Sequence, residues 1–364
     1  MIKEPLSYGL NASSKEYDGI HKYLRITDID EENRNFNDNK LTSPDIEFNA
    51  LSKRYLLDNN DLVFARTGAS TGKAYMYKKT DGEVYYAGFL IKASLTSDFN
   101  ANFIFQQTYQ KKYYHYVKII SQRSGQPGIN SKEYGNFKFS ITQIQEQNKI
   151  GKLFKLLDTL LTLYEMKKQL LTQLKQGIVN FLITKNGQKP QLRFSGFNNN
   201  WESKSFEKLL NYEQPTKYIV KKADYISQGT PVLTANKSFI LGYTNETNVY
   251  QNIPAIIFDD FTLESKYVDF PFMVKSSAIK ILTSKNSNLF FIYQLLNNQK
   301  FVQEGHSRHY ISVVQKKKVL VPSIQEQNKI GNLIKQLKNS IEQNSDIIAL
   351  LKSLKEFLLQ NMFL

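Results

Sequence analysis

The sequence predicts a mixed α/β (α+β) protein in which two globular units alternate with two long helices, forming a pseudo-two-fold internal repeat. The first observation is an octapeptide, IQEQNKIG, that occurs at Ile144–Gly151 and again, unchanged, at Ile324–Gly331. The second is that each copy follows a short strand-like run, at 137–141 and at 319–321. The third is that each copy begins a long stretch almost free of Gly and Pro. Repetition at a fixed offset indicates that one structural unit is used twice.

The first long stretch predicts a helix over residues 142–184. Its seam positions alternate in steps of four and three, a period of 3.5 residues that is typical of a helix paired with another helix. Forty helical residues would span about 60 Å. The seam consists of Leu153, Leu157, Leu160, Tyr164, Lys167, Leu171, Leu174, Ile178 and Phe181.

The second long stretch predicts a helix over residues 322–364 with the same alternation. Two polar residues interrupt its seam, and an Asn at such a position can fix the register of a helix pair. An amphipathic helix on a globular core would also show a stripe, but the shared octapeptide favours the two helices pairing with one another. The seam consists of Ile330, Ile334, Leu337, Ile341, Asn344, Ile348, Leu351, Lys355, Leu358 and Met362.

The remaining chain forms the globular units, at 1–141 and 185–321, and a polar linker, Lys185–Pro190, leads into the second. Both read as short strands followed by a helix, a polar loop and a final strand. In the first unit we expect strands at Asp61–Ala65, Lys73–Tyr77 and Tyr86–Leu95 and a helix at Phe103–Ile119. In the second we expect strands at Ala255–Phe258, Tyr267–Val274 and Ser277–Leu282 and a helix at Leu289–Val302.

The charge balance suggests a polyanionic partner. The chain has 48 Lys and Arg against 33 Asp and Glu, a net charge of +15, which attracts nucleic acid; a lysine-rich codon bias would add to the same excess. There is no cysteine, which excludes disulfides, thiolate zinc sites and cysteine nucleophiles and fits a reducing cytoplasm. No apolar run is long enough for a membrane helix, and Met1–Pro5 has no apolar region behind it, so we expect neither a spanning helix nor a secretory signal.

Three loops are candidates for DNA contact. Residues 121–130 and 304–312 are polar loops with Arg, Gly and amide or imidazole side chains, and Arg, Gln and Asn are the residues that bond base edges; solvated turns are the alternative. Residues 66–74 resemble a P-loop poorly, with three residues between the glycines and Ala74 after the lysine, so contact with DNA is favoured over nucleotide hydrolysis. Lys237 and Lys266 are further candidates outside these loops, so the full set is Arg66, Thr67, Ser70, Lys73, Arg123, Gln126, Asn130, Lys237, Lys266, Arg308 and His309.

A catalytic alternative is a metal-dependent nuclease or a methyltransferase acting alone. Asp259, Glu264 and Lys266 superficially match the two carboxylates and lysine of such nucleases, but the first unit has no counterpart and a turn is the simpler interpretation. The four histidines show no repeated ligand spacing. The basic and aromatic run Lys111–Lys118 is interpreted as a helix with a buried aromatic face rather than as a base-stacking surface.

Taken together, the arrangement resembles the specificity subunit of a type I restriction–modification system. The resemblance covers essentially the whole chain. Its most specific parts are the two octapeptides with their helices, the run Phe64–Lys73, and the stretch from Pro190–Phe194 to Trp201–Glu202.

The resemblance implies that each globular unit is a target recognition domain for one half of a bipartite double-stranded DNA sequence. It also implies that the helices form an antiparallel coiled coil that spaces the half-sites. Modification and restriction subunits would dock on this chain and hold S-adenosylmethionine, ATP and Mg²⁺, leaving this chain without a cofactor, a metal or a catalytic role. The chain indeed contains no Asn/Asp-Pro-Pro-Tyr/Phe methylation motif.

One feature departs from the family pattern. The second unit begins with residues 192–212, which include Trp201, whereas the first unit has no equivalent before Tyr8–Asn11. We therefore expect either a truncated start or a shortened first domain. A third hypothesis, a repeat scaffold that binds only proteins, also remains open.

Overall fold

The computed structural model describes residues 1–31, 33–37, 40–183, 190–222, 224–236, 238–301 and 309–363. The chain divides into two compact units, one comprising Met1–Met166 with Asp346–Leu364 and the other Lys167–Ser345. Each long helix therefore contributes one stretch to each unit.

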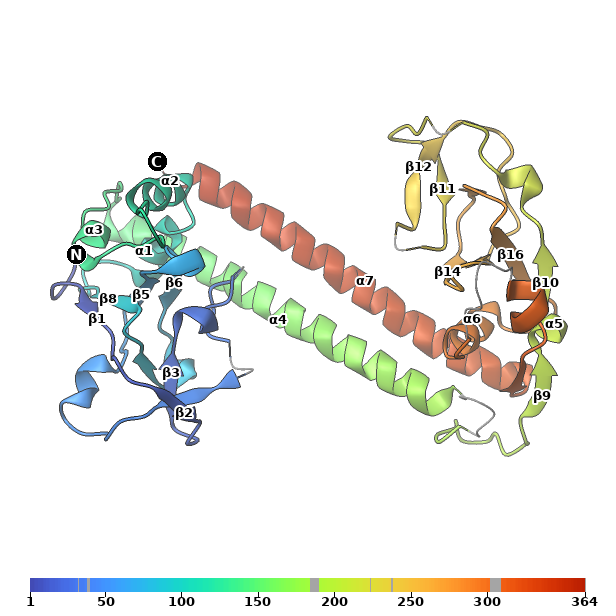
Figure 1. The fold of residues 1–364 in the computed structure, drawn as a ribbon, viewed down its shortest axis with the longest axis horizontal. Coiled ribbons are helices and arrows are strands. Elements are labelled where there is room, and N and C mark those ends of the chain that lie inside the picture. Colours follow the sequence, from blue (N-terminus) through green and yellow to red (C-terminus); the bar gives the residue numbers. More distant parts are fainter. Residues whose placement is uncertain are drawn as a thin grey trace. The chain divides into compact units, whose positions relative to one another are not determined.

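Unit 1 is built around a four-stranded antiparallel sheet of order β1-β8-β5-β6 (Figure 1). Its central strand β5 is an apolar run buried on both faces, as expected for a strand in the middle of a core. Two smaller pairs, β2 with β4 and β3 with β7, complete the strands. The strands are β1 (Ser7–Tyr8), β2 (Ser14–Glu16), β3 (His21–Leu24), β4 (Thr42–Pro44), β5 (Asp61–Ala65), β6 (Ala74–Met76), β7 (Glu83–Tyr86) and β8 (Leu90–Ser94); the short helices are α1 (Ala101–Gln107), α2 (Lys111–Ile120) and α3 (Ser131–Gly135).

Unit 2 repeats this plan. Its sheet β10-β16-β13-β14 has the same antiparallel order, a second sheet has the order β12-β11-β15, and β17 pairs with β9. The elements are β9 (Glu202–Ser205), α5 (Phe206–Leu209), β10 (Leu210–Glu213), β11 (Thr230–Leu233), β12 (Ile240–Thr244), β13 (Ala255–Asp259), β14 (Ser265–Val268), β15 (Met273–Val274), β16 (Ile279–Ser284), α6 (Leu289–Asn297) and β17 (Lys318–Val321). Together with the long helices described next, this confirms the predicted mixed α/β class with an internal repeat.

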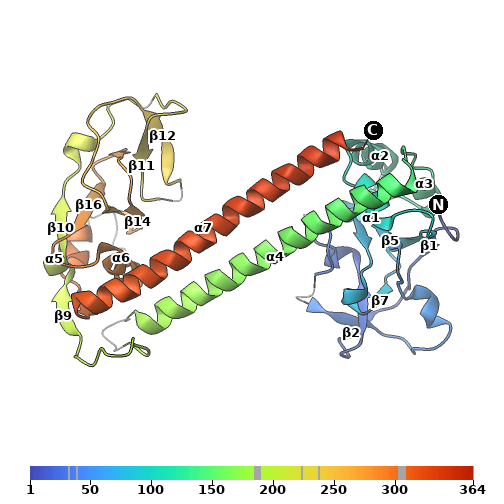
Figure 2. The ribbon, with the colours of Figure 1, turned by 180° about the vertical axis from the view of Figure 1, so that it is seen from behind.

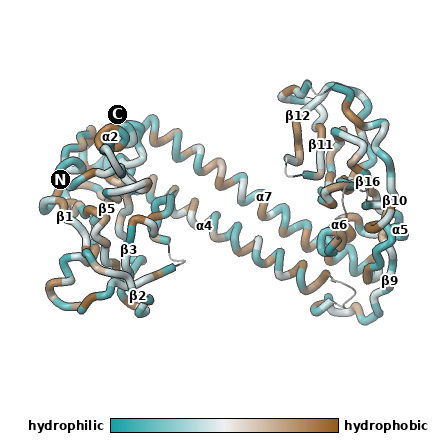
Figure 3. The backbone as a smooth tube through the Cα atoms, viewed as in Figure 1, coloured by the Kyte–Doolittle hydropathy of each residue, from teal (hydrophilic) through white to brown (hydrophobic). Residues whose placement is uncertain are grey.

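The long helices are α4 (Ile144–Leu182) and α7 (Ile324–Asn361). In each unit a stretch of α4 lies beside a stretch of α7 (Figures 1 and 2). In unit 1 Lys355 bonds Asp158 at 2.6 Å and Lys352 bonds Glu165 at 3.4 Å, so the two stretches run antiparallel. Both helices alternate apolar and polar residues along their length (Figure 3). None of the described helices is long and apolar enough to cross a membrane.

The helix-pairing residues differ in their burial. Leu157 and Ile348 are buried; the partly buried members are Leu153, Leu160, Leu171, Leu337, Ile341 and Leu351. Leu174 is 51% exposed, so its place in the seam was wrong. A straight helix turns about 20° per heptad away from a strict 3.5-residue repeat, and Leu174 lies three heptads beyond Leu153. The buried face of α4 instead follows Ile150, Phe154, Leu157, Leu161, Val179 and Leu182.

In each unit the octapeptide forms hydrogen bonds with the asparagine that caps the N-terminus of a short helix, an arrangement that we call the clasp. In unit 1 Asn100 caps α1 by accepting a hydrogen bond from the Phe103 amide at 3.0 Å. Its amide nitrogen donates to Asn148 Oδ1 at 2.8 Å, and its backbone N–H donates to Gln147 Oε1 at 3.2 Å. Gly151 gives room, because a Cβ there would collide with Asn100 Oδ1.

The same clasp occurs in unit 2 around Asn288, the cap of α6. Asn288 accepts from the Phe291 amide at 2.9 Å, donates to Asn328 Oδ1 at 2.9 Å, and bonds Gln327 Oε1 through its backbone at 3.1 Å. Gly331 stands where Gly151 stands in unit 1. The clasp explains why Gln, Asn and Gly recur in the same order.

Several expected elements have different bounds. Tyr86–Leu95 and Tyr267–Val274 each divide into two strands, because a turn separates β7 from β8 and a connection separates β14 from β15. The expected helix Phe103–Ile119 is two helices, α1 and α2, and the helix expected at Leu289–Val302 ends at Asn297. The run 137–141 is not a strand, since the described part of unit 1 offers it no partner, whereas its counterpart β17 pairs with β9.

Candidate nucleic-acid interface

Two of the loops singled out from the sequence lie side by side in unit 1. The Gly68 amide donates to the Pro127 carbonyl at 2.9 Å, and the Ile129 amide donates to the Arg66 carbonyl at 2.9 Å. Gly68 has a φ of +71°, and a Cβ there would lie 2.7 Å from the Gln126 side chain. The fold thus brings Arg66 and Thr67 next to Gln126, which is exposed.

Arg66 is held in a defined orientation by an aromatic ring. Its guanidinium lies 4.8 Å from the ring centre of Tyr8. The Tyr8 hydroxyl in turn accepts a hydrogen bond from the Ser131 amide at 3.2 Å. These bonds to Ser131, with the nearby Arg66 charge, lower the pKa of Tyr8. A guanidinium stacked on a ring keeps its N–H groups free for a planar acceptor such as a base edge or phosphate.

A cavity of about 570 Å³ opens beside Arg66 and contains residues that the sequence did not single out. Phe89, on the turn before β8, is 59% exposed, and its carbonyl accepts the Arg66 amide at 3.0 Å. Arg25 is tied to Asp28 by two hydrogen bonds of 2.8 and 3.0 Å, which raise the pKa of Arg25. The other polar members are Tyr8, Asn11, Ser14, Tyr23 and Thr27. No spacing rule identifies them, because they lie on different strands and turns that only the fold brings together.

Other predicted contacts are engaged within unit 1. Arg123 donates two hydrogen bonds to Glu133, at 2.6 and 2.8 Å, and one to the Ile120 carbonyl at 2.7 Å. Asn130 caps α3 by accepting from the Glu133 amide at 2.9 Å. Lys73 lies 3.5 Å from Glu31. Ser70 ends the turn after Arg66 and is partly buried.

In unit 2 the candidates are less well placed. His309 is 1% exposed and lies against the Asp260 carbonyl at 3.1 Å, so the expectation that it contacts DNA was wrong. Lys266 lies on β14 and is partly exposed. Lys237 and Arg308 lie outside the described residues.

The acidic residues considered for a nuclease have structural partners. Asp259 accepts hydrogen bonds from the Phe261 and Thr262 amides, both at 2.9 Å, and so closes a turn. Asp260 forms a buried ion pair with Lys280 at 3.2 Å and accepts the Tyr310 amide at 2.8 Å. Among the residues that the structure describes, no group of three or more His, Asp or Glu side chains could hold a metal ion.

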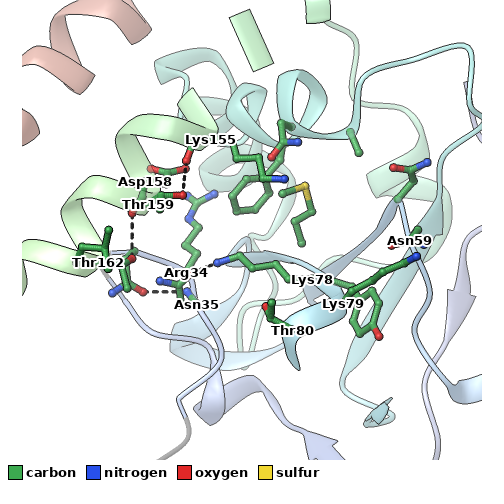
Figure 4. Close-up of a pocket in the computed structure, with 18 residues that line it drawn as sticks. Arg34, Asn35, Asn59, Lys78, Lys79, Thr80, Lys155, Asp158, Thr159 and Thr162 are labelled. Carbon is green, nitrogen blue, oxygen red and sulfur yellow. Dashed lines mark hydrogen bonds between the residues drawn. The ribbon is translucent and has the colours of Figure 1, made fainter. Parts of the chain in front are cut away.

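A second basic cavity of about 590 Å³ lies in unit 1 beside α4 (Figure 4). Lys78, whose ammonium donates to Asn35 at 2.5 Å, and Lys79 are exposed at its rim. Arg34 lines it but is internally engaged, with hydrogen bonds to the Thr108 carbonyl at 3.0 Å and the Tyr114 hydroxyl at 2.8 Å. Lys155 on α4, which is also exposed, lines the same cavity, so Lys78, Lys79 and Lys155 are the cations that it offers to a phosphate.

Comparison with known proteins identifies the family. The family model for the type I restriction modification DNA specificity domain matches residues 10–176 and 198–353. The EcoR124I/EcoR124II type I restriction enzyme specificity subunit of Escherichia coli is 50% identical over 123 residues, or 31% of this chain and 30% of that protein. The match therefore spans under a third of that relative.

A solved structure shows the same fold. The crystal structure of the type I restriction–modification S subunit from M. genitalium superposes with a TM-score of 0.73, covering 99% of this chain and 93% of that chain at 14% identity. At this identity the likeness concerns the fold. Since the family model matches most of the sequence in two consecutive copies, the chain belongs to the type I restriction–modification DNA specificity family.

Proposed function

We propose that this chain is the DNA-recognition subunit of a type I restriction–modification complex, in which each globular unit reads one half of a bipartite double-stranded target. Family membership and the net charge of +15 support this role. The function is binding rather than catalysis.

The paired loops of unit 1 carry the proposal. Arg66, stacked on Tyr8, and the exposed amide of Gln126 lie on adjacent loops beside an open cavity. Arg and Gln are the side chains that recognise guanine and adenine in the major groove. Base-reading groups on loops fixed by backbone hydrogen bonds give the rigid presentation that specificity requires.

The two units offer different chemistry at equivalent positions. The Asp260 amide donates to the Ala278 carbonyl at 3.0 Å, as the Arg66 amide donates to the Phe89 carbonyl at 3.0 Å. Asp260 therefore occupies in unit 2 the place of Arg66 in unit 1, but it is buried with Lys280. The two half-sites should accordingly differ in sequence.

The reaction chemistry is assigned to partner proteins. Methylation and restriction subunits would dock on this chain and supply S-adenosylmethionine, ATP and Mg²⁺, so this chain itself would catalyse no reaction. The engagement of Asp259 in a turn and of Asp260 with Lys280 supports a non-catalytic role. The assembly would act in the cytoplasm, where the DNA is.

Genome-wide methylation mapping in cells that express this chain with its modification subunits tests the proposal. We expect a bipartite motif, and Arg66→Ala should relax one half of it while the other half stays intact. Arg54→Ala is a matched control, since Arg54 also stacks on a tyrosine, Tyr55, at 4.7 Å, but lies outside the cavity.

Two outcomes would contradict the proposal. Cleavage or methylation of DNA by the isolated chain with Mg²⁺ or S-adenosylmethionine would instead support an enzyme that acts alone. A complete complex that protects no bipartite site in a footprint would favour a scaffold that binds only proteins.

A further inference from the structure

Phe89 lies in the turn between β7 and β8, beside the loop that carries Arg66. Its carbonyl accepts a hydrogen bond from the Arg66 amide at 3.0 Å. Phe89 is 59% exposed and lines the cavity of about 570 Å³ together with Arg66 and Tyr8. More than half of the surface of this residue is therefore open to a ligand in the cavity.

The backbone of this turn is fixed by hydrogen bonds. The Leu90 amide donates to the Ala87 carbonyl at 2.8 Å, which closes the turn, and the Gly88 amide donates to the Leu10 carbonyl at 2.7 Å. The neighbouring chain approaches closely at Gly9, where a Cβ would collide with the Ala87 carbonyl. A side chain on a fixed backbone loses less conformational entropy when it binds a ligand.

The equivalent turn of unit 2 forms without an aromatic residue. The Asp260 amide donates to the Ala278 carbonyl at 3.0 Å, as the Arg66 amide donates to the Phe89 carbonyl. The strands that follow these turns, β16 and β8, pair with β13 and β5 in the same register. Ala278 is therefore the counterpart of Phe89. Since an alanine suffices for this turn, the fold of the turn does not require the ring of Phe89.

We propose that Phe89 reads an apolar group in the major groove, the 5-methyl group of a thymine next to the base that Arg66 contacts. The inference rests on the proposed function and adds a base-reading residue to unit 1. Phe is one of the side chains that contact the thymine methyl group, and Arg contacts base edges in the same groove. The charged guanidinium and the uncharged ring would then read two neighbouring base pairs by different chemistry.

Insertion of the ring between two base pairs is the alternative contact. Apolar wedges of this kind enter from the minor groove and kink the duplex, whereas Arg and Gln side chains read base edges in the major groove. Phe89 lines the same cavity as Arg66, so we expect both residues to meet the same groove. An inserted ring would also depend little on a single methyl group.

Duplexes in which single thymines are replaced by deoxyuridine are the direct probe, because uracil lacks only the methyl group of thymine. Each duplex carries the bipartite motif found by methylation mapping and is titrated with the complex of this chain and its modification subunits. One replacement, in the half-site of unit 1, should weaken binding about fourfold, the effect of removing one methyl-sized apolar contact.

Variants of Phe89 complete a double-mutant cycle between protein and DNA. Phe89→Ala should bind the thymine and uracil duplexes equally well at that position, whereas Phe89→Leu keeps an apolar contact and should retain part of the preference for thymine. Ile20→Ala is the matched control, because Ile20 of unit 1 is also 59% exposed but lies outside the cavity. It should leave the preference for thymine unchanged.

Three results would overturn the inference. The first is the absence of any thymine whose replacement is coupled to Phe89, which includes a half-site without an A·T pair. The second is an equal loss of affinity for all duplexes in Phe89→Ala, as an inserted ring predicts. The third is loss of assembly with the modification subunits in Phe89→Ala but not in Ile20→Ala, which would assign the ring to a protein interface. In all three cases the natural complex still binds its bipartite motif, whereas the proposed function fails if no such motif is found.

Discussion

Replacing Gly331 by alanine tests whether the octapeptide is a clasp. In an ordinary helix, Gly→Ala stabilises by about 1 kcal/mol, because alanine has the better helix propensity. Here a Cβ at position 331 would lie 2.5 Å from Asn288 Oδ1 and 3.0 Å from Asn288 Cγ. The Asn288 side chain would have to move away from α6.

The cost follows from the bonds that Asn288 would lose. Loss of an Asn helix cap costs about 1 kcal/mol, and loss of the hydrogen bond to Asn328 costs roughly another 1 kcal/mol. Strain at the close contact adds to this, against the gain of about 1 kcal/mol in propensity. We therefore expect Gly331→Ala to destabilise unit 2 by about 1–2 kcal/mol.

The matched control is Gly177→Ala in α4, where a Cβ would meet nothing within 4 Å. This variant should stabilise unit 2 by up to about 1 kcal/mol, so the two substitutions should differ in sign. The chain has one tryptophan, Trp201, which lies in unit 2. Urea unfolding followed by its fluorescence reports on unit 2 even where the two units unfold separately.

The double variant separates the clash from the loss of the cap. With Asn288→Ala in place, Gly331→Ala should cost little more, because the group that it displaces has already been removed. If Gly331→Ala stabilises unit 2 as Gly177→Ala does, the clasp makes no energetic contribution and the reasoning fails.

Four further predictions follow from the site and the core. Arg66→Ala should weaken DNA binding by the assembled complex about tenfold and relax one half-site; equal discrimination at both halves in a competition assay would exclude Arg66 from base reading. The double variant Lys78→Gln, Lys79→Gln should weaken DNA binding by the same factor for all sequences. The slope of log affinity against log salt concentration should become shallower by up to about 2, because two phosphate contacts are lost. An unchanged slope would show that the basic cavity does not contact DNA. Asp260→Asn should destabilise unit 2 by about 3–5 kcal/mol in urea unfolding, since the buried Lys280 charge keeps its hydrogen bond to the Ser277 carbonyl but loses its carboxylate partner. Combining Asp260→Asn with Lys280→Met should recover much of this loss. Burial raises the pKa of Tyr250 to about 12, so between pH 10 and 12 the unfolded chain loses this proton first and the free energy of unfolding falls as pH rises. In Tyr250→Phe the urea midpoint of unit 2, followed by Trp201 fluorescence, should fall less steeply over this pH range. An equally steep fall would show that Tyr250 is not the group responsible.

The sequence predicted the duplication and the helices well because both depend on local pattern. A repeated octapeptide and stripes of apolar residues are visible without tertiary structure, and α4 and α7 begin at the octapeptides as expected. The exposure of Leu174 could not be seen, because periods of 3.5 and 3.6 residues coincide over one heptad and separate only over several.

The site was harder to predict because its members meet only through the fold. Tyr8 lies on β1, Arg66 follows β5 and Phe89 precedes β8, and no spacing in the chain joins these three residues. His309 resembled a surface residue because it follows a polar loop, but backbone contact with Asp260 buries it. Burial of a polar side chain depends on a partner elsewhere in the chain, which composition does not reveal.

The glutamates of the two octapeptides, Glu146 and Glu326, have different surroundings. The residues are identical and stand at equivalent points of identical octapeptides, yet one is exposed and the other is 1% exposed under Arg193. Gln147, Asn148 and Gly151 are kept in both halves because each makes or permits a contact with the cap of the short helix. Each glutamate also has a partner at the start of its helix, since Glu146 accepts a hydrogen bond from the Thr142 hydroxyl and Glu326 accepts from Arg193. An acidic side chain in the first turn of a helix also interacts favourably with the helix dipole, and this explains why both octapeptides keep the glutamate although its hydrogen-bond partner differs.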